Sequence, residues 1–255
     1  MRHIIAVLNQ KGGVGKTTTA INMGAYLAKM GKSVLVIDFD PQGNATSGLG
    51  IDKSIDSTMY DVLMNQVEPS NIVKETLIPG LFVLPANASL AAAEVELVAI
   101  EKREFKLSES IKNITYDYLL IDCPPALGLL TINALTAAEW VFIPVQAEYY
   151  ALEGLSQLLS VVQRVKQGLN PRLELLGLVL TMYDSRTSLS EQVKSELNKH
   201  FEDKLFKTVI PRNVRLAEAP SYGRPISEHD KWSKGARTYK ALARELDKKL
   251  SGVKS

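Results

Sequence analysis

A glycine-rich segment near the N-terminus carries residue types that suit phosphate binding. It reads NQKGGVGKTTT over residues 9–19, and its GKT triplet matches the end of the phosphate-binding pattern G-x-x-x-x-G-K-[ST]. Gln10 stands where that pattern has its first glycine, and a second lysine, Lys11, follows it directly. The segment therefore predicts a phosphate-binding loop that lacks one glycine and has gained one lysine.

The parts of this loop have separate chemical roles in that interpretation. Gly12, Gly13 and Gly15 let the backbone turn its N–H groups toward a phosphate without clashes from a Cβ atom. Lys16 would reach the β- and γ-phosphates, and the Thr17 hydroxyl would bind Mg²⁺. A helix beginning near Thr17 would add the partial positive charge of its N-terminus. The alternative is a glycine-rich turn without a ligand, and the order of strand, loop and helix argues against it.

Aspartates follow two of the apolar runs. Asp38 and Asp40 come at the end of VLVID, and Asp122 comes at the end of YLLID. Ligands of open α/β sheets bind beyond the carboxyl ends of the strands, so we expect these carboxylates near the loop. Asp122 has the form of the Walker B residue that holds hydrated Mg²⁺, Asp40 suits orientation of the attacking water, and Asp38 would support the metal shell. Each aspartate alone could merely cap a turn.

Short apolar runs that alternate with helical patterns predict the elements that position these residues. Most runs are apolar without alternation, as in parallel strands covered on both faces. We expect helices at 17–30, ended by Gly31, and at 153–167. The repeated units predict an α/β fold, doubly wound, with a mostly parallel sheet and helices on both faces, in a single domain over 1–255 with a frayed tail, SGVKS. The expected strands are 4–9, 33–38, 82–86, 118–122, 140–145, 176–182 and 208–210.

Composition limits the class of protein. The 255 residues are 45% apolar and 23% charged, and one cysteine excludes an intramolecular disulfide. The chain contains no apolar run of about 18 residues, and its start leads directly into the first strand, so we expect a cytoplasmic protein. The net charge of +2 is uneven: residues 1–163 sum to −6 and residues 164–255 to +8. The basic part is either a polyanion-binding face or an ordinary solvated surface.

Several longer motifs resemble the ParA/Soj family of chromosome- or plasmid-partitioning ATPases. They are KGGVGKTTT, DFDPQGNATSGLG, IDCPPALGLLTINAL, PVQAEYYALEGLSQLL and IPRNVRLAEAPSYG. The resemblance runs from about residue 2 to residue 250. It implies the deviant Walker A fold shared with MinD and the nitrogenase iron protein.

The resemblance assigns further roles within the site. Lys11 would act across a dimer interface on the partner's ATP, where it compensates transition-state charge much as an arginine finger does. Pro211 would pack against the adenine, and Asn213 would hydrogen-bond the base, although Pro-Arg-Asn without the resemblance is simply turn-forming. The predicted ATP-binding set is Lys11, Gly12, Gly13, Val14, Gly15, Lys16, Thr17, Thr18, Pro211 and Asn213, with Lys11, Lys16 and Asp40 in catalysis and Thr17, Asp38 and Asp122 at the metal.

The resemblance also implies partners. An ATP-bound homodimer would bind double-stranded DNA without sequence preference and associate with the nucleoid, and a ParB/Spo0J-like protein would stimulate hydrolysis. Loop arginines are free to reach phosphates, and Arg186 and Arg215 flank the nucleotide-side loops, so they are the foremost DNA candidates. The full candidate set is Arg186, Arg215, Arg224, Lys231, Lys234 and Arg237.

Three other functions compete with this one. A MinD-like membrane-surface ATPase needs a C-terminal amphipathic helix, and Tyr239, Leu242, Leu246 and Leu250 do share one helical face; we expect that modest stripe to dock on the core, so no membrane partner is predicted. An iron–sulfur ATPase needs two cysteines per subunit, and this chain has one. An ATP-dependent biosynthetic enzyme stays open.

The remaining chemically distinctive residues are expected to be bystanders. We expect Cys123 to be a packed, inert thiol. The histidines at positions 3, 200 and 229 show no metal-ligand spacing. The tryptophans, Trp140 and Trp232, are expected to be packing residues and not base-stacking platforms.

Overall fold

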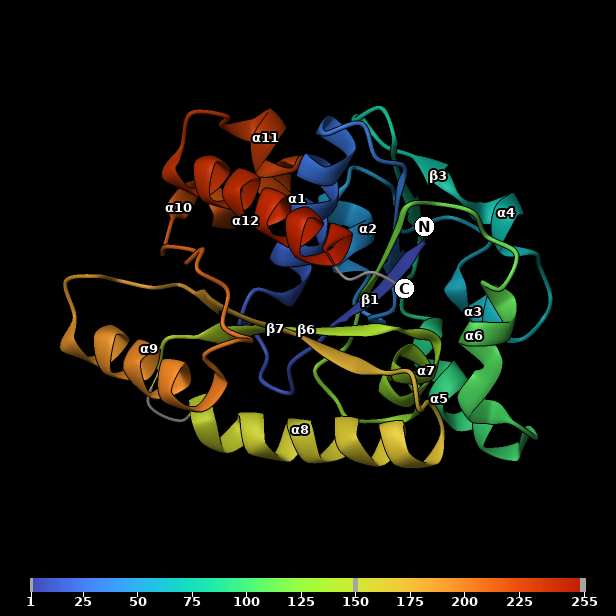
Figure 1. Ribbon diagram of the computed structural model, residues 1–255. Coiled ribbons are helices and arrows are strands. Elements are labelled where there is room, and N and C mark those ends of the chain that lie inside the picture. Colours follow the sequence, from blue (N-terminus) through green and yellow to red (C-terminus); the bar gives the residue numbers. More distant parts are fainter. Residues whose placement is uncertain (1, 149–150, 253–255) are drawn as a thin grey trace.

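The computed structural model describes residues 2–148 and 151–252, and its centre is a seven-stranded sheet (Figure 1). The strand order is β3-β4-β2-β5-β1-β6-β7. All neighbours run parallel except β3 and β4, which are antiparallel. This arrangement confirms the predicted doubly wound, mostly parallel fold. The strands are β1 (His3–Val7), β2 (Val34–Asp38), β3 (Lys74–Glu75), β4 (Leu81–Leu84), β5 (Tyr118–Asp122), β6 (Trp140–Gln146) and β7 (Glu174–Thr181).

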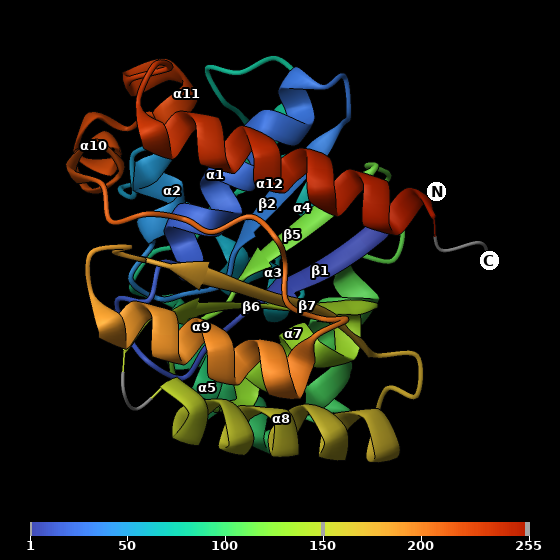
Figure 2. The same cartoon turned by 60° about the vertical axis from the view of Figure 1, so that its left-hand side comes forward.

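Helices cover both faces of this sheet because both faces of its central strands are apolar. Along β1, Ile4 and Ala6 belong to one buried cluster and Ile5 and Val7 to the other. Figure 2 shows α1 (Lys16–Lys29) and α12 (Lys234–Ser251) on one face, and α7 (Leu129–Ala137), α8 (Ala151–Gly168) and α9 (Ser188–Phe201) on the other. The sheet therefore holds two hydrophobic cores, one under each helical layer.

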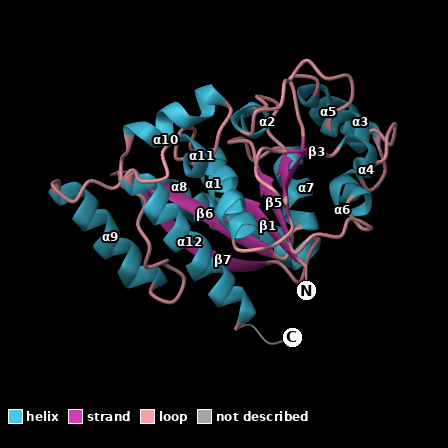
Figure 3. Cartoon of the chain, turned by 90° about the horizontal axis from the view of Figure 1, so that it is seen from above, coloured by secondary structure: helices cyan, strands magenta, loops and turns pink. Residues whose placement is uncertain are grey.

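Shorter helices complete the two layers. Seen from above, α3 to α6 gather beside β3, away from α9 (Figure 3). These short elements are α2 (Asn44–Gly48), α3 (Met59–Leu63), α4 (Pro69–Ile72), α5 (Leu90–Glu96), α6 (Lys106–Ser110), α10 (Val214–Glu218) and α11 (Ile226–His229), with 3₁₀ turns η1 (Leu97–Ala99), η2 (Arg103–Phe105) and η3 (Ala219–Tyr222).

The apolar stripe of the C-terminal helix packs inside the protein. Tyr239, Leu242, Leu246 and Leu250 are at most 1% exposed, and α12 lies along α1. The expected docking on the core is confirmed. Across residues 2–148 and 151–252, no helix is long and apolar enough to cross a membrane.

Two strand predictions differ from the structure. The predicted strand at 82–86 ends at Leu84, directly before Pro85, because proline has no N–H to donate to the ladder. Residues 208–210 form no strand, although they run beside β7: the Ile210 amide donates to the Leu180 carbonyl at 2.8 Å, and the pairing continues as a single bridge between Tyr183 and Pro211.

The end of α1 follows expectation, whereas the C-terminal tail begins as helix. Gly31 has φ 85° after α1, so it has the left-handed conformation expected of a residue that ends a helix. α12 extends to Ser251, one residue into the tail expected to fray. The last three residues of that tail lie outside the described residues.

Candidate functional site

The glycine-rich loop joins β1 to α1, as its sequence predicts. Gly13 and Gly15 have φ of 74° and 91°, a left-handed conformation that side chains with a Cβ rarely adopt. Gly12 differs, because its φ is not positive and a Cβ atom there would meet nothing within 4 Å. Two of the three glycines are therefore required by backbone conformation, whereas Gly12 keeps the outer edge of the loop small.

Two polar side chains tie the loop to strands β6 and β7. The Asn9 Oδ1 accepts from the Lys11 amide at 3.0 Å, and the Asn9 Nδ2 donates to the Pro144 carbonyl at 2.8 Å. On the other side, the Thr181 hydroxyl donates to the Val14 carbonyl at 2.8 Å. Neither Asn9 nor Thr181 was predicted as part of the site, because Pro144 is far from Asn9 in the sequence and Val14 is far from Thr181.

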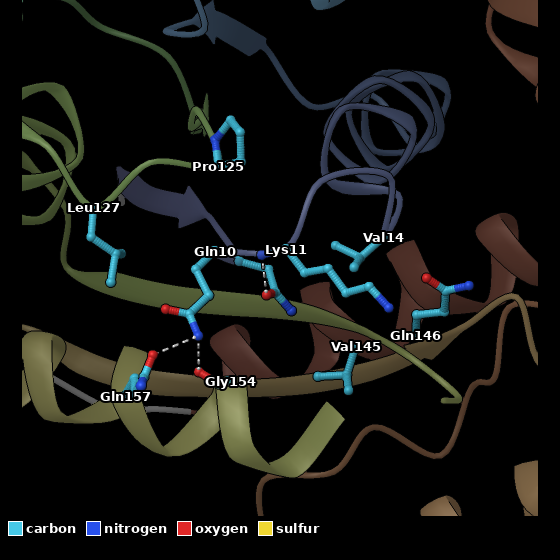
Figure 4. A pocket seen from close by; sticks show the side chains of 10 residues that line it. Gln10, Lys11, Val14, Pro125, Leu127, Val145, Gln146, Gly154 and Gln157 are labelled. Carbon is cyan, nitrogen blue, oxygen red and sulfur yellow. Dashed lines mark hydrogen bonds between the residues drawn. The ribbon is translucent and has the colours of Figure 1, made fainter. Parts of the chain in front are cut away.

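The missing glycine is explained by a contact with α8. The Gln10 Nε2 donates to the Gly154 carbonyl at 2.9 Å and to the Gln157 Oε1 at 3.2 Å (Figure 4). A Cβ atom on Gly154 would lie only 2.9 Å from that nitrogen. A glycine at position 10 could not make this contact. Gln10 therefore ties the phosphate loop to the helix that covers the opposite face of the sheet.

The two lysines of the loop lie in different environments. Lys16 is 7% exposed, and its Nζ donates to the Lys11 carbonyl at 3.3 Å. Burial lowers the pKa of Lys16, and the neighbouring Asp122 carboxyl opposes that change. The Lys11 side chain is 48% exposed and pairs with Glu148. Lys16 is thus enclosed within the site, whereas Lys11 lies at its outer edge.

A cavity of about 620 Å³ adjoins the loop on the Lys11 side. Figure 4 shows the Lys11 side chain running along it toward Gln146, with Pro125 and Leu127 on the opposite wall. Its lining is contributed by the loop after β1, the loop after β5, the end of β6 and the first turns of α8. Three of these segments follow the carboxyl ends of neighbouring parallel strands, where α/β proteins bind ligands.

Strand register brings the predicted carboxylates together below the loop. Asp122 pairs in register with Val7 on one side and with Asp38 on the other. Asp38 and Asp122 are fully buried, and Asp40 is 8% exposed. The three aspartates therefore lie at one sheet edge, directly under the loop that β1 leads into.

Asp38 already has partners for both of its oxygens. Its Oδ2 accepts from the Thr46 amide at 2.7 Å and from the Thr46 hydroxyl at 2.6 Å, and its Oδ1 accepts from the Asp40 amide at 3.3 Å. Burial raises the pKa of Asp38 to about 6, and the hydrogen bonds from Thr46 oppose that rise. Its geometry favours an indirect role, in which it fixes Asp40 and Thr46. A place in the metal shell stays a prediction.

Asp122 has no hydrogen-bond partner for either carboxylate oxygen within the described part of the chain. Burial and then the nearby Asp38 charge raise the pKa of Asp122 well above its usual range, although Thr17 and Lys16 oppose the rise. A buried carboxylate without a partner is costly, and it is the oxygen ligand that Mg²⁺ prefers. Its position beside Thr17 fits a metal ion that Thr17 and Asp122 would hold.

A magnesium ion needs few protein ligands, and Thr17 and Asp122 could supply them. In residues 2–148 and 151–252, no three His, Cys, Asp or Glu side chains are grouped so as to hold a metal. Mg²⁺ keeps several waters and commonly binds through one or two carboxylates and the substrate's phosphates. The described residues therefore suit an ion that arrives with a nucleotide.

The unpaired carboxylate leads to a stability prediction. Asp122→Asn is expected to stabilise the ligand-free protein at pH 7 by about 1–3 kcal/mol, because an amide of similar size and shape replaces a buried charge that Thr17 and Lys16 compensate only in part. The gain should shrink as the pH falls, since the raised pKa lets the wild-type carboxyl take up a proton and become neutral. Urea unfolding of both proteins across this pH range, without nucleotide, measures the difference. An equal loss of stability at every pH would contradict it.

A second pocket, of about 230 Å³, adjoins the other side of the loop. Gly15 and Thr18 line it together with Pro211 and Asn213, the two residues predicted to contact adenine. The Asn213 Oδ1 caps α10 by accepting from the Leu216 amide at 3.2 Å, so only its Nδ2 is left to donate to a base. The pocket lies where a base would sit if its phosphates occupied the loop, and the adenine contacts stay a prediction.

The predicted DNA candidates are all exposed, but the two foremost ones are already paired. Arg186 binds Asp184 through two hydrogen bonds of 2.9 and 2.7 Å, and Arg215 contacts Glu218 at 2.9 Å. Both pairs are exposed to solvent and can be exchanged for a phosphate. The other four candidates, Arg224, Lys231, Lys234 and Arg237, also lie on the surface.

One expected packing residue is not packed. Trp232 is 79% exposed, so its prediction as a packing residue is wrong, whereas Trp140 is half-buried against a core cluster. Trp232 lies in the turn between α11 and α12. Cys123 is fully buried, as expected, and burial raises the pKa of its thiol well above the usual range.

Known proteins share this arrangement across nearly the whole chain. A family model described as an AAA domain matches residues 2–175. The sporulation initiation inhibitor protein Soj of Bacillus subtilis is 56% identical over 249 residues, which cover 96% of this chain and 98% of Soj. The chromosome partitioning protein ParA of Caulobacter vibrioides is 51% identical over 248 residues, which cover 95% and 93%. The chain belongs to the ParA/Soj family of chromosome-partitioning ATPases.

Solved structures of related proteins share the fold of this ParA/Soj-family ATPase. MinD of Pyrococcus horikoshii, solved with Mg-ADP, has a TM-score of 0.82 and 28% identity, covering 100% of this chain and 99% of MinD. A cobyrinic acid a,c-diamide synthase of Mycobacterium smegmatis, solved with ADP and magnesium, has a TM-score of 0.87 and 38% identity, covering 100% and 97%. Proteins with this fold therefore include a biosynthetic enzyme as well as ATPases of cell division.

Proposed function

We propose that this partitioning ATPase is a nucleotide-controlled DNA switch. It binds ATP with Mg²⁺, forms a homodimer in that state, and binds double-stranded DNA without sequence preference. A ParB/Spo0J-like partner stimulates hydrolysis to ADP and phosphate, and DNA is then released. The observation that carries the proposal is the separation of the two loop lysines, one buried beside the carboxylates and the other exposed at the outer edge.

The nucleotide part of the proposal rests on the two pockets and the carboxylates between them. The phosphates lie against the loop and the start of α1, where backbone N–H groups and Lys16 compensate their charge. Thr17 and Asp122 would hold Mg²⁺, whose charge would compensate the unpartnered carboxylate of Asp122. Asp40, held by its own turn with the Gln42 amide donating to its Oδ1 at 3.0 Å, orients the water that attacks the terminal phosphate.

The dimer part rests on Lys11. Its ion pair with Glu148 is about half exposed, and such pairs contribute little to stability, so exchanging it for a partner's phosphate costs little. Gly12 beside it adds no side chain, so two loops can approach each other closely. Gln10 holds this segment against α8, which keeps Lys11 at the edge of the loop.

The DNA part rests on the charge of the C-terminal third and its connection to the nucleotide. Arg215 lies on α10, and this helix begins one residue after Asn213 in the proposed adenine pocket. A weak polyanion site on one subunit gains affinity when a dimer presents two copies to one duplex. ATP therefore need only control dimerisation in order to control DNA binding.

The switch is tested with the full chain in three nucleotide states. We expect a monomer without nucleotide or with ADP, and a dimer with ATP and Mg²⁺, by size-exclusion chromatography with light scattering. Affinity for two unrelated duplexes should rise together with dimer formation. A chain that stays monomeric with ATP, or that binds DNA equally well in all states, would contradict the switch.

A biosynthetic ATPase is the second candidate. It is favoured by the structural likeness to the cobyrinic acid a,c-diamide synthase of Mycobacterium smegmatis and by the 620 Å³ cavity next to the loop. The two functions differ in what accelerates ATP hydrolysis. The partitioning function predicts acceleration by DNA together with a ParB-like partner, and the biosynthetic function by a small carboxylic acid substrate with an amide donor. Phosphate release measured under both conditions separates them.

A further inference from the structure

The surface around Trp232 combines exposed apolar side chains with positive charge. Three large apolar side chains within residues 214–232 are exposed: Val214 by 70%, Tyr222 by 66% and Trp232 by 79%. Between residues 212 and 237 there are six Lys or Arg residues and three Asp or Glu residues. Exposed aromatic residues among cations are typical of surfaces that bind a charged partner with its own apolar faces.

The tryptophan is held outward by a structured turn. The Trp232 amide donates to the Asp230 Oδ1 at 3.1 Å, and the Ser233 hydroxyl donates to the Asp230 carbonyl at 2.8 Å. The same hydroxyl caps α12 by accepting from the Ala236 amide at 3.1 Å. These hydrogen bonds fix the backbone of the turn, so the exposed ring belongs to an ordered segment and not to a frayed chain end.

Asp230 also connects this turn to a predicted phosphate contact. Its Oδ2 lies 3.7 Å from the Arg215 Nε, and the Lys231 Nζ lies 5.3 Å from the centre of the Trp232 ring. A cation over an indole face is a favourable arrangement in its own right. One guanidinium, one ammonium and one aromatic ring are thus held on a single small surface.

We propose that Trp232 is an apolar DNA contact, which buries its ring against the sugars and base edges in a groove of a duplex while Arg215 and Lys231 bind its phosphates. This inference rests on the proposed DNA switch. A membrane is a poorer occupant, because an interfacial anchor needs a helix with a free apolar face. The apolar face of α12 is buried, and α10 and α11 have only five and four residues.

An apolar contact and a phosphate contact respond differently to salt. Binding to a phosphate releases counterions, so its loss flattens the plot of log K against log salt by about 0.9 for each phosphate. Burial of an indole ring releases no counterion, so its loss lowers the affinity and leaves the slope unchanged. This difference separates the role of Trp232 from that of its basic neighbours.

The experiment titrates two unrelated duplexes of equal length at several salt concentrations, with the full chain, ATP and Mg²⁺. Trp232→Ala should weaken binding to both by about tenfold, in the range for losing the burial of one large apolar side chain, with an unchanged slope. Arg215→Ala should flatten the slope, and Trp232→Phe should retain most of the affinity. Leu77→Ala is the matched control, since Leu77 is 66% exposed but lies beside β3 and β4.

The second measurement uses the tryptophan itself as the probe. Trp140→Phe leaves Trp232 as the only tryptophan, and its fluorescence should change when DNA is added with ATP. If the wild-type chain binds DNA and Trp232→Ala gives a superimposable salt curve, the inference fails and the proposed function stands. If the wild-type chain binds no DNA, the proposed function fails first. If Trp232→Ala instead abolishes binding to phosphatidylglycerol vesicles and spares DNA binding, the surface contacts a membrane and the inference is overturned.

Discussion

Asp40→Ala is expected to bind ATP about as tightly as the wild-type chain and to hydrolyse it about 10²- to 10⁴-fold more slowly, the range for loss of a group that manages a proton or water in the transition state. Asp40 belongs to the set of three aspartates and lies outside the phosphate-binding loop, so its replacement leaves the phosphate contacts of the loop intact. ATP then remains bound, and the proposed dimer accumulates.

Titration with a fluorescent nucleotide and phosphate release under saturating ATP measure the two quantities separately. Asp52→Ala is a suitable control, because Asp52 also accepts a hydrogen bond from the backbone two residues on, from Ser54 at 2.8 Å, but lies in an exposed loop. Asp40→Asn can retain the bond from the Gln42 amide and tests whether the charge is needed. A parallel fall in ATP affinity and hydrolysis would place Asp40 in nucleotide binding and refute this assignment.

The central strands and the loop could be predicted because their causes are local. Buried parallel strands need apolar residues on both faces, and runs such as YLLID have this composition. The carboxyl ends of parallel strands meet at one sheet edge, so Asp38 and Asp122 could be placed together before their register was known. The required conformations of Gly13 and Gly15 likewise follow from the loop alone.

Contacts between distant segments could not be predicted in the same way. Gln10 appeared as a departure from a pattern, and its reason lies on α8, about 144 positions along the chain. The partners of Asn9 on β6 and of Val14 on β7 are equally remote. Polar contacts of this kind depend on tertiary geometry and leave no periodic signal in the sequence.

The exposure of an individual side chain also could not be predicted from its residue type. Tryptophan is apolar enough to suggest packing, and Trp140 follows that rule. Trp232 does not, because the Asp230 turn and the start of α12 carry its backbone outward. A residue-type rule describes an average environment, whereas a single turn decides where one side chain lies.

The remaining large effect is expected from Lys16→Ala, which should lower ATP affinity by about 10- to 100-fold, as expected when a hydrogen bond to a charged group is lost. The Lys16 ammonium group is buried beneath the phosphate-binding loop, where Nζ donates to the Lys11 carbonyl at 3.3 Å. It also compensates Asp122, so its removal should destabilise the ligand-free protein. Lys16→Arg keeps the charge but not the shape, and it tests whether charge alone is sufficient.

Lys11→Ala is the matched variant, because it removes the same functional group from the same loop. Its side chain is about half exposed and its partner, Glu148, is at the surface, so neither stability nor ATP binding within the chain should change. Dimer formation with ATP and hydrolysis should both fall. Glu148→Gln releases Lys11 without removing it and should leave the dimer intact.

Nucleotide titration, thermal unfolding and light scattering on Lys16→Ala and Lys11→Ala decide between two arrangements. If Lys16 serves its own subunit and Lys11 serves the partner, the first variant loses ATP before any dimer can form, and the second keeps ATP as a monomer. If both variants lose ATP equally, both lysines contact the same nucleotide within one chain. The substitution of Gln10 for glycine would then serve only to fasten the loop to α8, and the exposed position of Lys11 would have no part in assembly.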